Sequence, residues 1–378
     1  MTDSFQLGPI RPPSEAYSLL IRATKNCPWN RCKFCHIYKG QRFELRPVEE
    51  VKKDILAAEA IQDGLKALAW KSGYGGSVEA VAAAVLQNPP NEAYFNIALW
   101  LYHGGTSAFL QDANTLIMRT PDLIEIIKFL KETLPSITQV TSYARSKTAA
   151  KKKPEEMKAL HEAGLSRLHI GLESGYDPLL EYMDKGVTAA DHIKGGKNIV
   201  ASGISLCEYV LLGLGGKKMW REHAVETAKV LNQIDPAFIR VRTLTVKEGM
   251  PLYEEVQNGS FVRLNDEEIV EEEKLLIENL DCSAYFVSDH ITNLLQELEG
   301  KLPDDKDKML AAISRFQSLS PEERHNFRVG RRVGIYSQLD DMADEQKHEL
   351  AGHAIEKLSD DGKKVSDETI YFLMERFI

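Results

Sequence analysis

Long apolar runs and an excess of positive charge are both missing from this sequence of 378 residues. No apolar run approaches the roughly 20 residues that span a bilayer, so we expect no membrane span. The first residues lack the basic start and apolar core of a signal peptide. The formal net charge of −9 provides no general affinity for polyanions, so nucleic acid is not an expected partner. These absences predict a cytoplasmic protein.

Cysteine is also scarce, with five residues in the chain and no second C-x-x-C pair. Three of the five, Cys27, Cys32 and Cys35, lie within nine positions in CPWNRCKFC. Cytosolic thiols stay reduced, which argues against a disulfide framework. A closed zinc site usually takes four ligands in two separated pairs, and the nearest histidine, His36, directly follows Cys35. Three thiolates without a fourth ligand are typical of a [4Fe–4S] cluster with one open iron, and zinc remains the alternative.

Short β-rich segments alternate with helical ones over the first 250 residues. Strands are predicted at 16–24, 107–114, 139–146, 167–174, 204–216 and 238–246, and an Ala-rich helical stretch at 77–102 reads as an insertion. This alternation favours a parallel sheet covered by helices. Beyond residue 250 the pattern is helical and rich in carboxylates, with one helix expected to begin at Ser288 or Asp289.

Polar residues recur on one face of three predicted strands, because side chains alternate with a period of two. The pairs are Tyr143 with Arg145, His169 with Glu173, and Arg240 with Arg242. A parallel strand covered on both faces should be almost wholly apolar. The pattern therefore favours a polar, ligand-holding interior, as found in barrels. The alternative is that these residues lie at the surface of short or edge strands.

A first strand that leads into C-x4-C-x-aromatic-C, followed by further βα units, resembles the radical S-adenosylmethionine superfamily. The resemblance is closer to the branch with oxygen-independent coproporphyrinogen oxidase-like and Elongator-subunit-3-like proteins, through HIGLESG and YVLLGLGG. It covers about residues 16–250. The first two cysteines are one residue further apart than is common in that family, and FLQDAN replaces its Gly-Gly-Glu stretch. The implied fold is a partial (β/α)6 TIM-type barrel over 1–250 with a mainly helical extension over 251–378.

The resemblance also implies roles for individual residues. Cys27, Cys32 and Cys35 would ligate a [4Fe–4S] cluster whose open iron binds S-adenosylmethionine. Four further residues would contact this cofactor, and each has a plainer alternative. Phe34 would lie near the adenine, or would simply pack in the core, and Asp112 would bind the methionine ammonium, or would be a turn residue. Glu173 would contact the cofactor, or would lie at the surface, and Lys185 would reach the ribose or carboxylate, or would complement a helix dipole. Gly213 would let the backbone approach the adenine or ribose, or would serve a tight turn.

The function implied is reductive cleavage of S-adenosylmethionine to a 5′-deoxyadenosyl radical, which takes a hydrogen atom from a small-molecule substrate. An external electron donor such as flavodoxin or ferredoxin would be required, and oxidoreductase is the default reaction class. Arg145, Arg240 and Arg242 are expected to position an anionic substrate or the cofactor, because buried guanidinium groups need partners and Glu173 alone cannot neutralise three. The alternatives are an RNA-modifying radical enzyme and a non-enzymatic interaction protein that binds zinc or a cluster.

Overall fold

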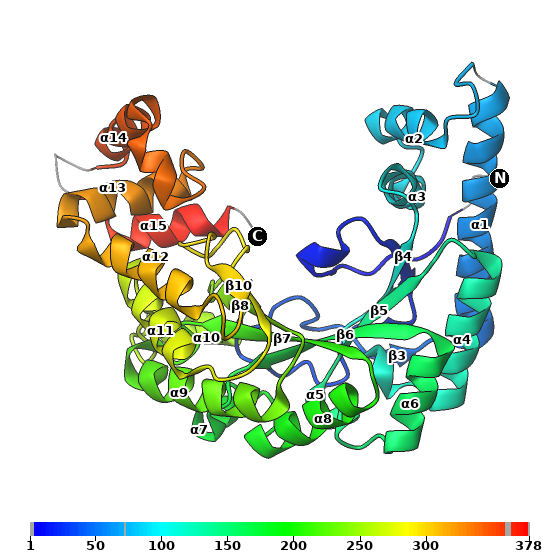
Figure 1. Ribbon diagram of the computed structural model, residues 1–378, viewed down its shortest axis with the longest axis horizontal. Coiled ribbons are helices and arrows are strands. Elements are labelled where there is room, and N and C mark those ends of the chain that lie inside the picture. Colours follow the sequence, from blue (N-terminus) through cyan, green and yellow to red (C-terminus); the bar gives the residue numbers. More distant parts are fainter. Residues whose placement is uncertain (1–3, 72, 360–363, 377–378) are drawn as a thin grey trace. The chain divides into compact units, whose positions relative to one another are not determined.

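The computed structural model describes residues 4–71, 73–359 and 364–376. The chain divides into two compact units, each built from several segments. The first unit comprises residues 1–30, 37–170 and 194–206, and the second comprises residues 31–36, 171–193 and 207–378. Eight strands form one sheet in the order β1-β4-β5-β6-β7-β8-β9-β10 (Figure 1). Among the described residues, no helix is long and apolar enough to cross a membrane.

The strands of the first unit are parallel and closely match the sequence prediction. They are β1 (Leu19–Arg22), β4 (Ser107–Gln111), β5 (Gln139–Ala144) and β6 (Leu165–Glu173), while β2 (Thr24–Lys25) and β3 (Glu44–Leu45) form a separate antiparallel pair. In β5 and β6, Tyr143 lies beside His169. The two side chains therefore share one face of the sheet, as the period-two pattern predicted.

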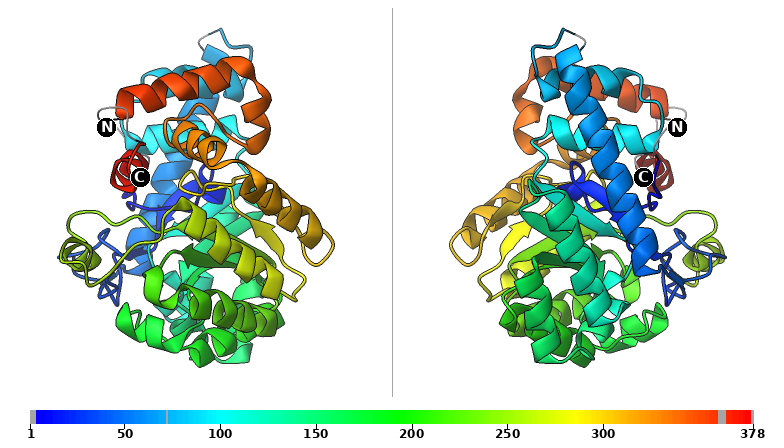
Figure 2. Two further views of the ribbon diagram at one scale, coloured as in Figure 1. Left: turned by 90° about the vertical axis from the view of Figure 1, so that its left-hand side faces the viewer. Right: turned by 90° about the vertical axis from the view of Figure 1, so that its right-hand side faces the viewer.

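Helices cover this part of the sheet. They are α1 (Val48–Lys71), α2 (Val78–Gln87), α3 (Glu92–Tyr102), α4 (Thr120–Thr133), α5 (Ser146–Ala149) and α6 (Pro154–Ala163), with 3-10 turns at η1 (Pro13–Glu15) and η2 (Thr115–Ile117). The long helix α1, blue in Figure 2, packs against α4. Helix α6 begins with Pro154 and ends at Gly164, whose φ of 117° is accessible because glycine has no Cβ. The predicted insertion at 77–102 is the helix pair α2 and α3.

The strands of the second unit are β7 (Ser205–Leu212), β8 (Phe238–Thr243) and β9 (Tyr285–Val287), which are parallel, and β10 (Glu299–Lys301), which runs antiparallel to β9. Its helices are α7 (Asp177–Tyr182), α9 (Gly216–Ile234), α10 (Pro251–Gln257), α11 (Asp266–Asn279), α12 (Lys306–Ser318), α13 (Pro321–Arg332), α14 (Glu345–Leu358) and α15 (Asp367–Glu375), with η3 at Leu339–Ala343; α8 (Ala189–Ala201) has residues in both units. Strands β9 and β10 lie beyond residue 250, so the division at that position stays a prediction.

One helix prediction is wrong. Residues 288–298 form turns and irregular backbone between β9 and β10, and the next helix, α12, begins at Lys306. Neither Ser288 nor Asp289 is therefore an N-cap. The side chain of Asn293 donates to the carbonyls of Val241 and Ser288 at 2.9 and 3.2 Å. Such tertiary hydrogen bonds satisfy the polar groups that helical bonds would otherwise have satisfied.

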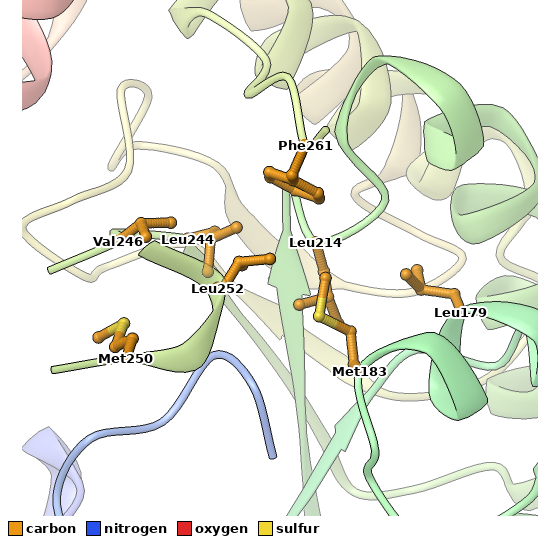
Figure 3. Close-up of a cluster of buried hydrophobic side chains, with 8 residues drawn as sticks. All are labelled: Leu179, Met183, Leu214, Leu244, Val246, Met250, Leu252 and Phe261. Carbon is orange, nitrogen blue, oxygen red and sulfur yellow. The ribbon is translucent and has the colours of Figure 1, made fainter. Parts of the chain in front are cut away.

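A cluster of buried apolar side chains forms a core in the second unit (Figure 3). It joins residues from α7, the end of β7, the segment after β8 and α10: Leu179, Met183, Leu214, Leu244, Val246, Met250, Leu252 and Phe261. Phe34, from the cysteine segment, packs against this cluster as a partly buried residue. Part of the cysteine loop is thus attached to a dry, well-packed core.

Candidate functional site

The cysteine loop begins directly after β2, and its first part is held by a buried carboxylate. Asp112, which follows β4, is 0% exposed. Its oxygens accept hydrogen bonds from the Arg22 Nε at 2.9 Å, the Asn26 backbone N–H at 2.8 Å and the Tyr38 hydroxyl at 2.7 Å. Burial and the neighbouring Asp112 carboxylate raise the pKa of Tyr38, so its hydroxyl remains a donor. Asp112 thereby fixes the backbone immediately before Cys27.

This geometry gives Asp112 a structural role. Its buried carboxylate accepts hydrogen bonds from three donor groups of the chain itself, and its contact with the methionine ammonium stays a prediction. It is also more than a local turn residue, because its partners lie 74 to 90 positions away in the sequence. This anchoring role of Asp112 is visible only in the tertiary structure and could not be read from the sequence FLQDAN.

Around Cys27 the backbone turns sharply. Asn26 and Asn30 adopt φ angles of 66° and 51°, a region that asparagine tolerates better than most residues. The Asn30 N–H points at the Cys27 Sγ at 3.4 Å. A donor aimed at sulfur stabilises a thiolate, which is the form that ligates metal.

The segment between the other two cysteines is tied to the second unit at Lys33. The Lys33 N–H donates to the Met183 carbonyl and its carbonyl accepts from the Leu252 N–H, both at 3.0 Å. The Lys33 Nζ lies 2.7 Å from a Glu255 carboxylate oxygen, and the Tyr182 hydroxyl donates to the other oxygen. Burial raises the pKa of Glu255, but these two hydrogen bonds outweigh that effect and hold the pKa below its usual value.

The hydrogen bonds at Lys33 fix the turn that carries Cys32 and Cys35. The Cys35 N–H donates to the Cys32 carbonyl at 3.3 Å. Phe34, between them, packs on the apolar cluster and lies 5.5 Å from the Lys185 Nζ, which sits over its ring. Core packing therefore accounts for Phe34, and its expected place near the adenine stays a prediction.

Glu173 and Lys185, predicted as separate cofactor contacts, form an ion pair. Their oxygen and nitrogen are 2.9 Å apart, and the side chains are 17% and 12% exposed. Glu173 has a φ of 63°, which a residue with a Cβ adopts only when its surroundings demand it. A Cβ on Gly171 would lie 2.2 Å from the Glu173 carboxylate, so a larger residue there would displace the end of the Glu173 side chain.

Sequence reasoning missed a third ionisable residue, whose charge interacts with this pair. Glu208, in the middle of β7, is 0% exposed, and neither carboxylate oxygen has a hydrogen-bond partner among the described residues. Burial raises its pKa well above the usual value; the charge of Lys185 opposes this shift and that of Glu173 adds to it. Burial therefore favours the neutral form of the Glu208 carboxyl group. The sequence feature that could have identified Glu208 is a carboxylate residue within the otherwise mostly apolar segment SLCEYVLL.

The glycine turn after β7 is held by α11. Gly213 has a φ of 81°, and its N–H donates to a Glu272 carboxylate oxygen at 2.5 Å. A Cβ there would meet the Ile269 side chain at 2.7 Å. Burial raises the pKa of Glu272 to about 8, although the Gly213 hydrogen bond lowers it. The tight-turn interpretation of Gly213 fits this geometry, since its donor is already used inside the chain.

The three arginines have different surroundings. Arg145, in the first unit, places its guanidinium 5.1 Å from the centre of the Trp29 ring. Arg240, in the second unit, binds both carboxylate oxygens of Asp289 at 2.9 and 2.8 Å. Arg242 is half-buried and has no hydrogen bond or ion pair with any described residue. Asp289 therefore neutralises Arg240, and the positioning of an anion by these arginines stays a prediction.

The cysteines can be sorted by exposure. Cys27, Cys32 and Cys35 are half-buried, while Cys207 and Cys282 are buried elsewhere in the fold. In the parts of the chain that the structure describes, no group of three or more His, Cys, Asp or Glu side chains is arranged as a ready metal site. The donor set still fits an iron–sulfur cluster, because three accessible thiols lie on one loop and an N–H is directed at one sulfur.

Comparisons with known proteins match a part of the chain that includes the cysteine loop. The chain matches the sequence model of a family described as "Radical SAM superfamily" over residues 21–228. An uncharacterised protein of Methanocaldococcus jannaschii is 30% identical over 103 residues, 27% of this chain and 31% of that protein. A tRNA uridine(34) acetyltransferase of the same organism is 25% identical over 118 residues, 31% of this chain and 22% of that protein. The matched region thus spans less than a third of either relative.

The matches to solved structures have low sequence identity and TM-scores below 0.5. The chain is 16% identical to an archaeal Methanocaldococcus infernus Elp3 with an N-terminal deletion, with a TM-score of 0.40, covering 48% of this chain and 46% of that one. It is 13% identical to a radical S-adenosylmethionine methyltransferase, TsrM, from Kitasatospora setae, with a TM-score of 0.45, covering 93% of this chain and 65% of that one.

Proposed function

Because the chain belongs to the radical S-adenosylmethionine superfamily, we propose that it cleaves S-adenosylmethionine reductively and abstracts a hydrogen atom from a small-molecule substrate. Its cofactors are those of the superfamily, a [4Fe–4S] cluster and S-adenosylmethionine. When bound and reduced, these cofactors supply a 5′-deoxyadenosyl radical. The protein contributes binding, orientation and exclusion of side reactions.

The observation that carries the proposal is the anchored cysteine loop. Asp112 holds the backbone at Asn26, and Met183 and Leu252 hold the backbone at Lys33. Each half of the loop is thus anchored locally, which restricts the backbone around its thiols and reduces the entropy lost when a cluster binds. We assign Cys27, Cys32 and Cys35 as the ligands, since the other two cysteines are buried and separate.

The Glu173–Lys185 ion pair supports binding of an amino acid group. A zwitterion carries one ammonium and one carboxylate, and the pair offers one group of each opposite sign. We assign Glu173 to the methionine ammonium and Lys185 to the methionine carboxylate or the ribose. Two charge-assisted hydrogen bonds of this kind would replace one ion pair, which favours the bound state.

We also propose a reaction class and an electron donor. Oxidoreductase chemistry rests on the resemblance alone, and a small flavodoxin- or ferredoxin-type protein is the expected reductant. Arg242 supports an anionic substrate, because a half-buried guanidinium without a partner is costly unless a ligand completes it. Arg145 stays a prediction as a second positioning residue.

Anaerobic reconstitution tests the proposal. The protein should bind about four irons with sulfide, as three-thiolate cluster loops do, and reduction with S-adenosylmethionine should release 5′-deoxyadenosine. One zinc per chain without sulfide would instead favour the interaction-protein alternative. Formation of S-adenosylhomocysteine alone would indicate ordinary methyl transfer.

RNA modification is the second candidate function. The observation in its favour is the partial match to a protein named tRNA uridine(34) acetyltransferase. The net charge of −9 is unfavourable for polyanion binding, so the absence of a nucleic-acid partner stays a prediction. Binding of tRNA that weakens steeply with salt would support this candidate. The cytoplasmic location also stays a prediction.

A further inference from the structure

Two arginines project from the same face of β8, and only one of them is neutralised. Arg240 and Arg242 are half-buried, while the residues between and beside them, Ile239 and Val241, are buried. Asp289 binds Arg240 through both carboxylate oxygens. Arg242 keeps its full charge, with no ion pair or hydrogen bond to any part of the chain that the structure describes. The end of β8 therefore carries one uncompensated positive charge.

His290 directly follows Asp289, the partner of Arg240 on the same face of β8 as Arg242, and offers a second donor. The backbone N–H of Thr292 points at the His290 Nδ1 at 3.3 Å, and the Thr292 hydroxyl is 2.7 Å from the same atom. A backbone N–H can only donate, so Nδ1 is the unprotonated nitrogen and the neutral ring carries its proton on Nε2. Burial, assisted by the charge of Arg242, lowers the pKa of His290 to about 3. His290 is therefore neutral at physiological pH.

The loop that carries Asp289 and His290 is held rigidly. Asn293 donates to the Val241 carbonyl at 2.9 Å, which ties the loop to β8. From α13, Arg331 donates to the carbonyls of Asn293 and Leu294, each at 3.0 Å. Arg332 donates to the Thr292 carbonyl at 2.9 Å. The helices of the extension thus preorganise this loop, which lowers the entropic cost of binding.

We propose that Arg242 and His290 form a binding site for a single carboxylate of the substrate. Arg240 and Asp289 cancel, His290 is uncharged, and Arg242 leaves a net charge of +1 on these four side chains. That balance matches a monoanion better than a phosphate dianion. A guanidinium binds a carboxylate through two parallel hydrogen bonds, and the His290 Nε2–H supplies a further donor. That the molecule bearing this carboxylate is the substrate of the radical reaction rests on the proposed function.

Acetate is the probe for the site, because its binding needs neither cluster nor substrate. Acetate titrated into the cluster-free full chain should shift the imidazole signals of His290 in a nitrogen-15 spectrum and bind roughly millimolar, as expected of a four-atom ligand. Arg242→Gln should weaken binding at least tenfold, and Arg242→Lys should weaken it several-fold while it keeps the charge. Arg221→Gln, which removes an exposed arginine of α9, should leave binding unchanged.

Changing the charge of the site should change its preference. Asp289→Asn frees Arg240 and adds a second cation, so the affinity for inorganic phosphate should rise about tenfold relative to acetate. Equal acetate affinity in the wild type and in folded Arg242→Gln and Arg242→Lys proteins would overturn the proposal. A spectrum that shows the His290 proton on Nδ1 would also contradict it. Neither result would affect cluster formation or 5′-deoxyadenosine release, so the proposed function is tested separately.

The carboxylate has one other possible source, the methionine moiety of S-adenosylmethionine. Equilibrium binding of S-adenosylmethionine to reconstituted Arg242→Gln protein distinguishes the two. Unchanged cofactor affinity, together with lost acetate binding, supports a substrate carboxylate. A tenfold loss of cofactor affinity would assign the site to the cofactor and end the substrate assignment.

Discussion

Glu173 and Lys185, twelve positions apart in the sequence, form an ion pair of 2.9 Å above Gly171. Each had been expected to meet the cofactor alone. Their pairing means that neither charge is buried without a partner before the cofactor arrives, which avoids the several kcal/mol that an isolated buried charge costs. The pair is thus stable in the free protein, and we propose that it opens toward the zwitterion of the cofactor.

Removing either member of this pair should weaken S-adenosylmethionine binding. We expect Glu173→Gln and Lys185→Met each to raise the dissociation constant by about tenfold, or about 1.4 kcal/mol, because each loses a charge-assisted hydrogen bond. Equilibrium dialysis with the reconstituted protein measures this, and iron content should be unchanged. If both variants bind the cofactor normally, the pair has a structural role only.

The cysteine assignment predicts a clear division among single variants. Cys27→Ala, Cys32→Ala and Cys35→Ala should each abolish the broad absorption near roughly 400 nm that thiolate-ligated iron–sulfur clusters show. Cys207→Ala and Cys282→Ala should retain it, since both thiols are buried apart from the loop. Iron and sulfide analysis after anaerobic reconstitution provides the measurement. A full cluster in Cys32→Ala would falsify the ligand set.

The anchor at Lys33 should govern how firmly the cluster is held. Glu255→Gln removes the ion pair with Lys33, which we value at about 1 kcal/mol because it is partly exposed. Iron release to a ferrous chelator should then accelerate about fivefold. Glu254→Gln, at an exposed neighbouring position of α10, is the matched control and should behave as the wild type. Equal release rates in the two variants would show that Glu255 does not support the loop.

Two buried acids on α11 predict that stability falls as pH rises. Burial raises the pKa of Glu272 and of Glu273 to about 8, so between pH 4.5 and 8 the folded state binds protons that the unfolded state has released. The free energy of unfolding therefore decreases with rising pH in this window. His223, whose pKa burial lowers to about 4, acts in the opposite direction, but only below about pH 6.5.

The test is therefore made between pH 6.5 and 8, where Glu272 and Glu273 change the free energy of unfolding and His223 does not oppose them. Each acid should lower the free energy of unfolding by on the order of 1–2 kcal/mol across this range. Urea unfolding at several pH values measures the slope. Glu272→Gln keeps the hydrogen-bonding shape without the titration, so its slope should be shallower than that of the wild type. A stability that rises over this window would contradict the assignment of neutral buried acids.

The sequence by itself determined the features that depend on near neighbours in the chain. The six strands of the first 250 residues appear close to their predicted places, because alternation of β-rich and helical segments is a local signal. The cysteine triplet needed no fold to be recognised, since its members lie on one short loop. Gly164, which directly follows α6, ends that helix with a left-handed backbone, a local role typical of glycine.

The tertiary structure alone decided which charges meet. Asp289 pairs with Arg240 across 49 positions, and Asp112 reaches Arg22 across 90; no periodic pattern encodes such distances. The same reason explains the helix wrongly expected after residue 287. Its local propensity was overridden by hydrogen bonds from Asn293, Arg331 and Arg332. Propensity acts over a few residues, whereas charge pairing depends on strand register and on segments that only folding brings together.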